Sequence, residues 1–224
     1  MVRTLLLDLD GTLVDTVPDL ASALNRLMRT RGLAPFGHKE TAAMVGDGVA
    51  VLVGRAFAAR GLTPDDTAVA EFAGDYGRHA ADESRPYPGV PDLLRDLAAE
   101  GWRLAVCTNK PEAAARSLLE ATGILPLLCA VGGGDSFPVR KPDPAHLVET
   151  LRAASGTAAL GTAAQAIMVG DHANDVVAAR GAGLKSVFVT WGYGPLGMAE
   201  GADAVAGDLP ALRDAIARLL PFRA

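Results

Sequence analysis

Residues 4–15 read TLLLDLDGTLVD, an apolar run that ends in two carboxylates and a glycine. Apolar residues throughout are typical of a strand buried on both faces, and the acidic end marks where the strand reaches solvent. Because side chains alternate along a strand, we expect Asp8 and Asp10 to project to the same side. Gly11 allows a turn directly after them. Two neighbouring carboxylates repel each other, so the stretch predicts a partner cation, either a metal ion or a Lys or Arg.

The chain after residue 15 falls into two parts. Residues 16–83 contain four helix-like segments and no convincing strand. From residue 86 onward, apolar strand-like segments alternate with amphipathic helices, which is typical of a parallel sheet covered on both faces. We expect helices at 16–32, 38–44, 49–60, 64–81, 90–100, 111–122, 144–154, 175–182 and 209–220, and strands at 103–108, 127–131, 166–169, 186–189 and 202–206. The sequence therefore predicts an α/β fold, with a Rossmann-like parallel-sheet core (1–15 and 84–224) and a small all-helical domain (16–83) inserted after the first strand.

The composition narrows the possible functions. Half of the 224 residues are hydrophobic and the mean hydropathy is +0.22, so a substantial core can form. The formal net charge of −5 disfavours a nucleic-acid or anionic-membrane surface, because both favour basic patches. Cys107 and Cys129 lie in apolar runs and are expected to be buried free thiols in a reducing compartment. We recognise no signal peptide and no stretch long enough to span a membrane, so we expect a cytoplasmic protein.

Polar residues follow two further strands of the expected sheet. Ligands of such sheets bind where the strands end. Thr108 and Asn109 follow the second core strand, where a hydroxyl and backbone N–H groups could bind a phosphate, although a simple capping turn is the alternative. Asp171 and Asp175 follow a later strand and offer the oxygen ligands that Mg²⁺ prefers. Asp175 could instead hold a lysine or a bound water, or be a favourable carboxylate at a helix N-terminus.

Lys141 stands in the loop RKPDP, residues 140–144, before an expected helix. Two prolines restrict the backbone there, so the position of the ammonium group can be fixed rigidly. A solvated lysine ahead of a helix is the alternative. His172 is a candidate acid or ligand by position alone, and a place at the rim of the site suits it better.

Residues 192–197 read GYGPLG and match the pattern G-x-G-x-x-G. The proline interrupts the turn, and too little chain follows for a dinucleotide-binding half, so we reject that interpretation. We expect a mobile loop instead, with Trp191 and Tyr193 packed on the inserted helices or on the core.

The motifs D-x-D-G-T-L-x-D, T-N-K, K-P and G-D-x-x-x-D occur in the order found in the haloacid dehalogenase-like superfamily, which the chain closely resembles and most of whose members are magnesium-dependent phosphatases. The resemblance implies that Asp8 is the nucleophile and forms an aspartyl-phosphate, and that Asp10 is the general acid and base. It implies that Thr108 binds the transferring phosphoryl group and that Lys141 offsets negative charge. The implied Mg²⁺ ligands are Asp8, Asp10, Asp171 and Asp175. An acid at position 10 favours a phosphatase over a dehalogenase.

In that superfamily, helices inserted just after the first motif form a cap that closes over the site and selects the leaving group. The resemblance implies this role for residues 16–83. The substrate-binding candidates are Asn109 of the core and Gly46, Asp47, Gly48 and Arg55 of the insertion. Backbone N–H groups at the helix start and a bidentate guanidinium could bind an anion, although a turn with an exposed arginine is the alternative.

Residues 45–56 and 132–144 resemble the phosphoglycolate phosphatase branch. This implies a small phosphorylated metabolite, 2-phosphoglycolate, as substrate, with no nucleic-acid or membrane partner, and a monomer or homodimer. A sugar-phosphate phosphatase, a phosphoglucomutase and a pyrophosphatase are the alternatives within the superfamily. Outside it, a phospho-receiver domain or a catalytically inactive binding module would use similar residues, although a receiver is shorter and lacks the helical insertion.

Overall fold

The computed structural model describes residues 3–155 and 165–221, and its centre is a six-stranded parallel sheet. The strand order is β5-β4-β1-β6-β7-β8, which places β1 in the middle between β4 and β6. The strands are β1 (Thr4–Leu7), β4 (Arg103–Cys107), β5 (Ala130–Gly132), β6 (Ala166–Gly170), β7 (Lys185–Val189) and β8 (Ala204–Ala206). The predicted α/β fold with a parallel sheet is confirmed.

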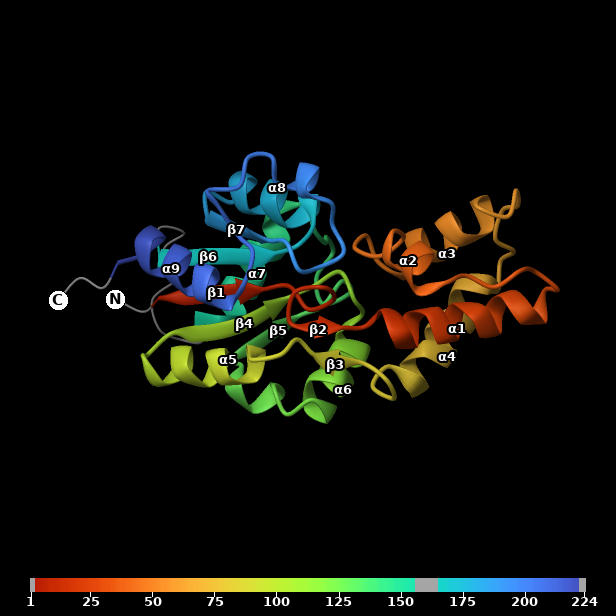
Figure 1. Ribbon diagram of the computed structural model, residues 1–224, viewed down its shortest axis with the longest axis horizontal. Coiled ribbons are helices and arrows are strands. Elements are labelled where there is room, and N and C mark those ends of the chain that lie inside the picture. The colour runs from red at the N-terminus through yellow and green to blue at the C-terminus, as the bar shows by residue number, and fades with distance from the viewer. Residues whose placement is uncertain (1–2, 156–164, 222–224) are drawn as a thin grey trace.

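Helices cover both faces of this sheet (Figure 1). The core helices are α5 (Val90–Ala99), α6 (Glu112–Ala121), α7 (Pro144–Ser155), α8 (Ala173–Gly181) and α9 (Leu209–Leu219). Leu5 and Leu7 pack in one hydrophobic cluster with α5, α6 and α9, whereas Leu6 packs in another with α7 and α8. The alternation of the leucines therefore explains why β1 is apolar throughout. Burial of each such leucine contributes about 1.5–3 kcal/mol.

Four helices form a separate group beside the end of the sheet where β1 finishes (Figure 1). They are α1 (Val17–Thr30), α2 (His38–Ala42), α3 (Val49–Ala58) and α4 (Ala68–His79). Their inner faces share a hydrophobic cluster of their own that includes Leu24, Met28, Phe72 and Tyr76. This group therefore has its own core and is not simply a layer on the sheet.

Apart from shifts of one or two residues at the ends of helices and strands, the structure differs from the expected elements in the following places. A short antiparallel ribbon, β2 (Val14–Asp15) with β3 (Arg85–Pro86), joins the two chain segments that enter and leave the helical group. Each of its strands has only two residues, which is too short for a recognisable strand pattern in the sequence. Helix α4 begins at Ala68, four residues later than expected. The expected strand at 127–131 is a 3₁₀ turn, η1 (Leu125–Leu127), followed by β5, because Pro126 suits a turn better than a strand.

The two cysteines differ in environment. Cys107 is buried, and burial raises the pKa of its thiol to about 12, so it remains a protonated thiol. Cys129 is exposed, so the expectation of a buried thiol is wrong for this residue. It lies between η1 and the short edge strand β5, where no further strand covers it. Both cysteines are free. Within residues 3–155 and 165–221, none of the helices combines the length and the apolar character that crossing a membrane requires.

Candidate active site

Three buried carboxylates meet at the end of the central strands. Asp8, Asp171 and Asp175 each offer an oxygen within 4.8 Å of the others. Asp8 follows β1 directly, and its N–H donates to the Val169 carbonyl of β6 at 2.9 Å, so the ladder holds the two strand ends together. Asp171 follows β6, and Asp175 lies in the first turn of α8. Parallel pairing of β1 with β6 therefore brings these acids from opposite ends of the sequence to one point.

Lys141 is the cation of this cluster. Its Nζ lies 2.8 Å from Asp8 Oδ1 and 2.6 Å from Asp175 Oδ1, and its side chain is only 1% exposed. Burial by itself would lower the pKa of Lys141, but attraction to Asp175 and Asp8 raises it above its ordinary value. Lys141 is therefore a permanent cation here rather than the solvated lysine that was the alternative.

The cluster carries more negative charge than Lys141 can offset. Burial, together with the charge of Asp8, raises the pKa of Asp171 to about 6, and burial raises that of Asp175 to about 7. Among the described residues of the cluster, three carboxylates face one ammonium, so two negative charges are left when all are ionised. Hard oxygen donors with this excess charge fit a divalent cation.

Asp171 and Asp175 are held by different partners. Asp171 Oδ1 accepts from the Thr12 hydroxyl at 2.9 Å, and its Oδ2 accepts from the Tyr193 N–H at 2.7 Å. Both oxygens of Asp175 are engaged, one by Lys141 and the other by the His172 N–H at 3.0 Å. Asp175 therefore orients Lys141 as well as belonging to the acidic cluster.

Thr108 and Asn109 lie beside the cluster, after β4. Thr108 Oγ1 accepts from the Lys110 N–H at 3.2 Å, so the hydroxyl proton remains available for another acceptor. Helix α6 begins only at Glu112, whose N–H donates to Asp135 at 2.7 Å. The expected phosphate seat at a helix start is therefore reduced to the Thr108 hydroxyl and the loop, because the first helical amide is already bound.

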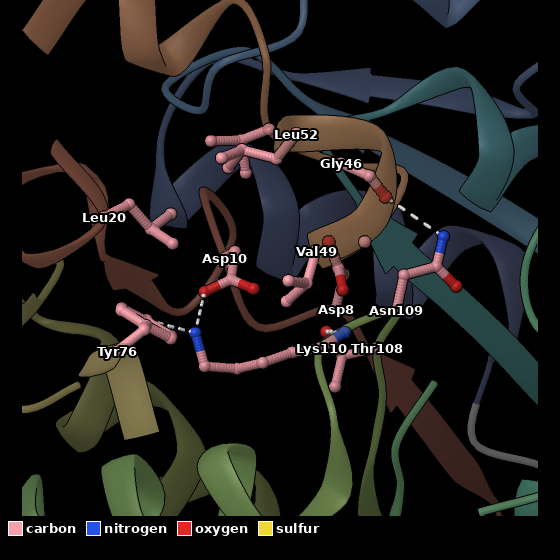
Figure 2. A pocket seen from close by; sticks show the side chains of 12 residues that line it. Asp8, Asp10, Leu20, Gly46, Val49, Leu52, Tyr76, Thr108, Asn109 and Lys110 are labelled. Atoms are coloured by element: carbon pink, nitrogen blue, oxygen red, sulfur yellow. Dashed lines mark hydrogen bonds and ion pairs between the residues drawn. The ribbon is translucent and has the colours of Figure 1, made fainter. Parts of the chain in front are cut away.

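A second buried cation, Lys110, was given no role from the sequence. Its Nζ lies 2.9 Å from Asp10 Oδ1 and is hydrogen-bonded to the hydroxyl of Tyr76 on α4 (Figure 2). The Lys110 side chain is 3% exposed, and these contacts hold its pKa above the ordinary value despite burial. Asp10 therefore pairs with Lys110 and lies outside the group formed by Asp8, Asp171 and Asp175. The position of Lys110 directly after Thr108 and Asn109, at the end of the same strand, could have indicated that it lies near the site.

A cavity of about 40 Å³ lies between the sheet end and the helical group. Figure 2 shows the carboxylates of Asp8 and Asp10 and the ammonium group of Lys110 on its core side, with apolar side chains of the helices opposite them. Its lining residues are Asp8, Asp10, Leu20, Val45, Gly46, Gly48, Val49, Leu52, Tyr76, Thr108, Asn109 and Lys110. The site therefore draws on both parts of the molecule.

The Gly46 carbonyl joins the helical group to the core. It accepts hydrogen bonds from the Asn109 side-chain amide at 3.0 Å and from that of Asn174 at 2.9 Å. The His172 ring lies against Gly46, since a Cβ built there would be 2.6 Å from the ring Cδ2. Gly46 also has a φ of +120°, which favours glycine. His172 thus packs on Gly46 and is also the N-cap residue of α8, where its Nδ1 accepts from the Asn174 N–H at 3.4 Å.

Asp47 and Arg55 are not among the residues that line the cavity. Arg55 Nη2 lies 2.5 Å from Asp47 Oδ2, and Nη1 donates to the Met44 carbonyl at 3.0 Å. The guanidinium therefore braces the loop before α3, whereas Gly46 and Gly48 reach the cavity itself.

His146 lies beneath the loop of Lys141 and is held neutral. Its Nδ1 accepts from the Lys141 N–H at 3.2 Å, and Nε2 lies 3.1 Å from the Gly133 carbonyl, so the proton is on Nε2. Burial, and to a smaller extent the charge of Lys141, lowers the pKa of His146 to about 4.

We expect the free energy of unfolding to fall as the pH drops from 6.5 to about 4. Over that range the unfolded histidine binds a proton that the buried imidazole does not, so stability is present above the unfolded pKa and is lost below it. The loss is at most about 3 kcal/mol. Urea unfolding of the wild type and His146→Gln measures it, because glutamine keeps a donor and an acceptor but carries no charge. Parallel pH curves for the two proteins would contradict the expectation.

Comparison with known proteins agrees with the motifs. The haloacid dehalogenase-like hydrolase family matches residues 2–183. A phosphoglycolate phosphatase from Agrobacterium fabrum is 42% identical over 214 residues, covering 93% of this chain and 90% of that protein. One from Cereibacter sphaeroides is 46% identical over 192 residues, covering 83% and 84% of the two chains.

Solved structures show the same arrangement. The crystal structure of a predicted phosphoglycolate phosphatase from Haemophilus somnus has a TM-score of 0.85 and 30% identity, covering 96% of this chain and 97% of that one. Such likeness over nearly the whole length includes the helices α1–α4, which a receiver domain lacks. The family match to residues 2–183 confirms the resemblance seen in the motifs. The chain therefore belongs to the haloacid dehalogenase-like hydrolases.

Proposed function

We propose that the protein is a Mg²⁺-dependent phosphomonoester hydrolase that cleaves 2-phosphoglycolate to glycolate and phosphate. The observation that carries this proposal is a pair of buried lysines. Lys141 lies in the acidic cluster with Asp8, and Lys110 lines the cavity that Asp8 also lines, where it pairs with Asp10. A substrate with a phosphate and a carboxylate has two anionic groups for these two cations. The relatives named phosphoglycolate phosphatase support the same substrate.

In this proposal Asp8 is the nucleophile and forms an aspartyl-phosphate, which water then hydrolyses. Asp10 protonates the leaving alkoxide and later takes a proton from the attacking water. The Thr108 hydroxyl donates to a phosphoryl oxygen, and Lys141 offsets charge there. Asp8 and Asp171 would hold Mg²⁺, with Asp175 bound to Lys141 beside them and Asp10 nearby. The ion would offset negative charge on the transferring phosphoryl group.

Residues 16–83 act as the cap in this proposal, and residues 1–15 and 84–224 form the catalytic core. The cap supplies an apolar wall, with Leu20, Val49 and Leu52, opposite the charged core residues. A small cavity enclosed in this way suits a two-carbon leaving group. It excludes bulk water from the acyl phosphate until the alcohol has left.

An activity panel tests the substrate. We expect kcat/KM for 2-phosphoglycolate to exceed that for glucose 6-phosphate, glucose 1-phosphate and pyrophosphate, each assayed with Mg²⁺ and with EDTA. Equal turnover of the hexose phosphates would refute the choice of substrate. Activity that persists in EDTA would refute the dependence on a metal ion.

Lys110→Met tests the recognition of the carboxylate. Loss of Lys110 also affects Asp10, so the informative quantity is a ratio of kcat/KM between phosphoglycolate and n-propyl phosphate, which lacks the carboxylate. Loss of a charged hydrogen bond of roughly 1.5–3 kcal/mol should lower this ratio about 10- to 100-fold. Lys110→Arg, which keeps the charge, is the matched control. A ratio that stays constant in Lys110→Met would mean that Lys110 does not bind the substrate carboxylate.

A further inference from the structure

The loop after β7, where the sequence matches G-x-G-x-x-G, binds the acidic cluster directly. The N–H groups of Tyr193 and Gly194 both point to Asp171 Oδ2, at 2.7 and 3.4 Å. A Cβ built on Gly192 would lie 2.4 Å from the same oxygen. The loop backbone therefore packs closely around one carboxylate of the proposed metal site.

The side chain of Tyr193 reaches in the other direction, to the start of α1. Its hydroxyl oxygen accepts from the N–H groups of Thr16 at 2.7 Å and Val17 at 3.2 Å, and it donates to Asp15 Oδ1 at 2.8 Å. Thr16 is the N-cap residue of α1, yet its own side chain makes no capping hydrogen bond. The tyrosine hydroxyl therefore provides an acceptor for two amides at the start of α1, of which the Val17 N–H also donates to Asp15 Oδ1 at 3.3 Å.

The tyrosine ring is confined between these two ends. It packs against the hydrophobic cluster of α1–α4. A Cβ built on Gly11 would lie 2.9 Å from the ring Cδ2 and 2.5 Å from Asp171 Oδ2, so Gly11 leaves space for both groups at once. Because the Tyr193 ring and the Asp171 carboxylate are packed in one tight space, a displacement of either group requires the other to move.

From these contacts we propose that Tyr193 is a positioning residue that couples the seat of α1, the first helix of the cap, to the position of Asp171. One residue bonds Asp171 through its backbone and the entry of the cap through its hydroxyl. A cation bound at Asp171 fixes the loop, and the loop fixes the hydroxyl that holds α1. By reciprocity, the position of α1 then affects how Asp171 is presented to the cation.

Hydrogen exchange of the Thr16 and Val17 amides tests this coupling without any assay of activity. In the wild type, adding Mg²⁺ should slow their exchange by about fivefold, a coupling of the size usual between two sites. Tyr193→Phe keeps the ring and the backbone N–H to Asp171 but removes the hydroxyl. Exchange of the Thr16 amide should be about tenfold faster in this variant, and that of the Val17 amide less so because Asp15 remains an acceptor; neither should still respond to Mg²⁺.

Ser84→Ala is the matched control, because it removes another hydroxyl at the cap–core junction. The Ser84 hydroxyl donates to Asp19 of α1 at 2.6 Å, on the chain segment that leaves the cap. Ser84→Ala leaves every contact of Asp171 and Tyr193 in place, so the Thr16 and Val17 amides should still respond to Mg²⁺. If Ser84→Ala loses the response as fully as Tyr193→Phe, or if Tyr193→Phe retains it, the coupling through Tyr193 is refuted.

The inference rests on the proposed metal site, and calorimetry separates the two. If the wild type binds Mg²⁺ but its amides do not respond, the coupling fails and the proposed function stands. If the wild type binds no Mg²⁺, the proposed function fails as well. In kinetics at saturating Mg²⁺, Tyr193→Phe should raise KM for phosphoglycolate about fivefold with kcat nearly unchanged, because the reacting groups of the core remain in place. An equal fall in kcat with unchanged KM would contradict the positioning role.

Discussion

Asp8→Asn should abolish turnover of phosphoglycolate, with a loss on the order of 10⁴-fold or more in kcat, while the protein remains folded. An asparagine amide is not a nucleophile, so no acyl phosphate can form. Folding should survive because Lys141 keeps Asp175 as a partner at 2.6 Å, and one of three crowded carboxylates is gone. Phosphate release, together with mass spectrometry of the quenched enzyme for an added phosphoryl group, provides the measurement.

Asp96→Asn provides the control for Asp8→Asn, since Asp96 is an exposed residue on α5. It should change neither kcat nor the free energy of unfolding by more than experimental error, as is usual for surface sites. Retained turnover in Asp8→Asn would place the nucleophile elsewhere. If Asp8→Asn loses turnover because it unfolds, kinetics do not test the role of Asp8. Detection of a phosphoryl group on Asp8 of the wild-type enzyme by mass spectrometry then decides the question.

Lys141→Met should both inactivate the enzyme and make its stability depend on a metal ion. Removing one partner of a buried ion pair costs about 3–5 kcal/mol, because the remaining charge is left uncompensated. Asp8 and Asp175 would lose the shared ammonium that lies within 2.8 Å of each. Mg²⁺ would then be the remaining cation for the cluster, so the difference in stability between Mg²⁺ and EDTA should be larger in the variant than in the wild type.

Urea unfolding at pH 8, with Mg²⁺ and with EDTA, measures this effect. In the wild type, burial raises the pKa of Asp171 to about 6 and that of Asp175 to about 7, and loss of Lys141 raises the pKa of Asp175 further. A high pH therefore favours the ionised acids and brings the uncompensated charge closest to its largest. Lys185→Met is the matched control: its ammonium lies 2.6 Å from Asp203, but 54% of the side chain is exposed. That surface pair should contribute at most about 1 kcal/mol. Equal effects of the two substitutions would show that Lys141 does not neutralise the cluster.

The acidic cluster could be predicted because it depends on topology alone. Asp8 and Asp171 each follow an apolar strand, and strands of a parallel sheet end at the same edge. No contact between side chains had to be known to bring them together. Lys141 could also be predicted as a site residue from the sequence, because the prolines of its loop indicated that the position of its side chain is fixed.

The contacts that cross between cap and core could not be predicted in this way. Tyr76 reads as one more apolar residue of an amphipathic helix, and only tertiary packing places its hydroxyl on Lys110. The pairing of Arg55 with Asp47 is local, yet an exposed arginine and a substrate-binding one have the same sequence signal. Tyr193 was recognised as a residue that packs, but its hydroxyl bonds a helix 176 residues away in the sequence.

The double hydrogen bond to Gly46 also bears on how such an enzyme can change its preference for substrates. The acceptor is a main-chain oxygen, and both donors belong to the core, at Asn109 and Asn174. The side chains of Val49 and Leu52 line the cavity but make neither of these hydrogen bonds, so exchanging them leaves this contact between the helical group and the core in place. The contact with the core and the apolar wall of the cavity therefore depend on different atoms of one short segment. A library confined to the side chains of Val49 and Leu52 should yield new substrate selectivities from variants that keep the hydrogen bonds to Gly46.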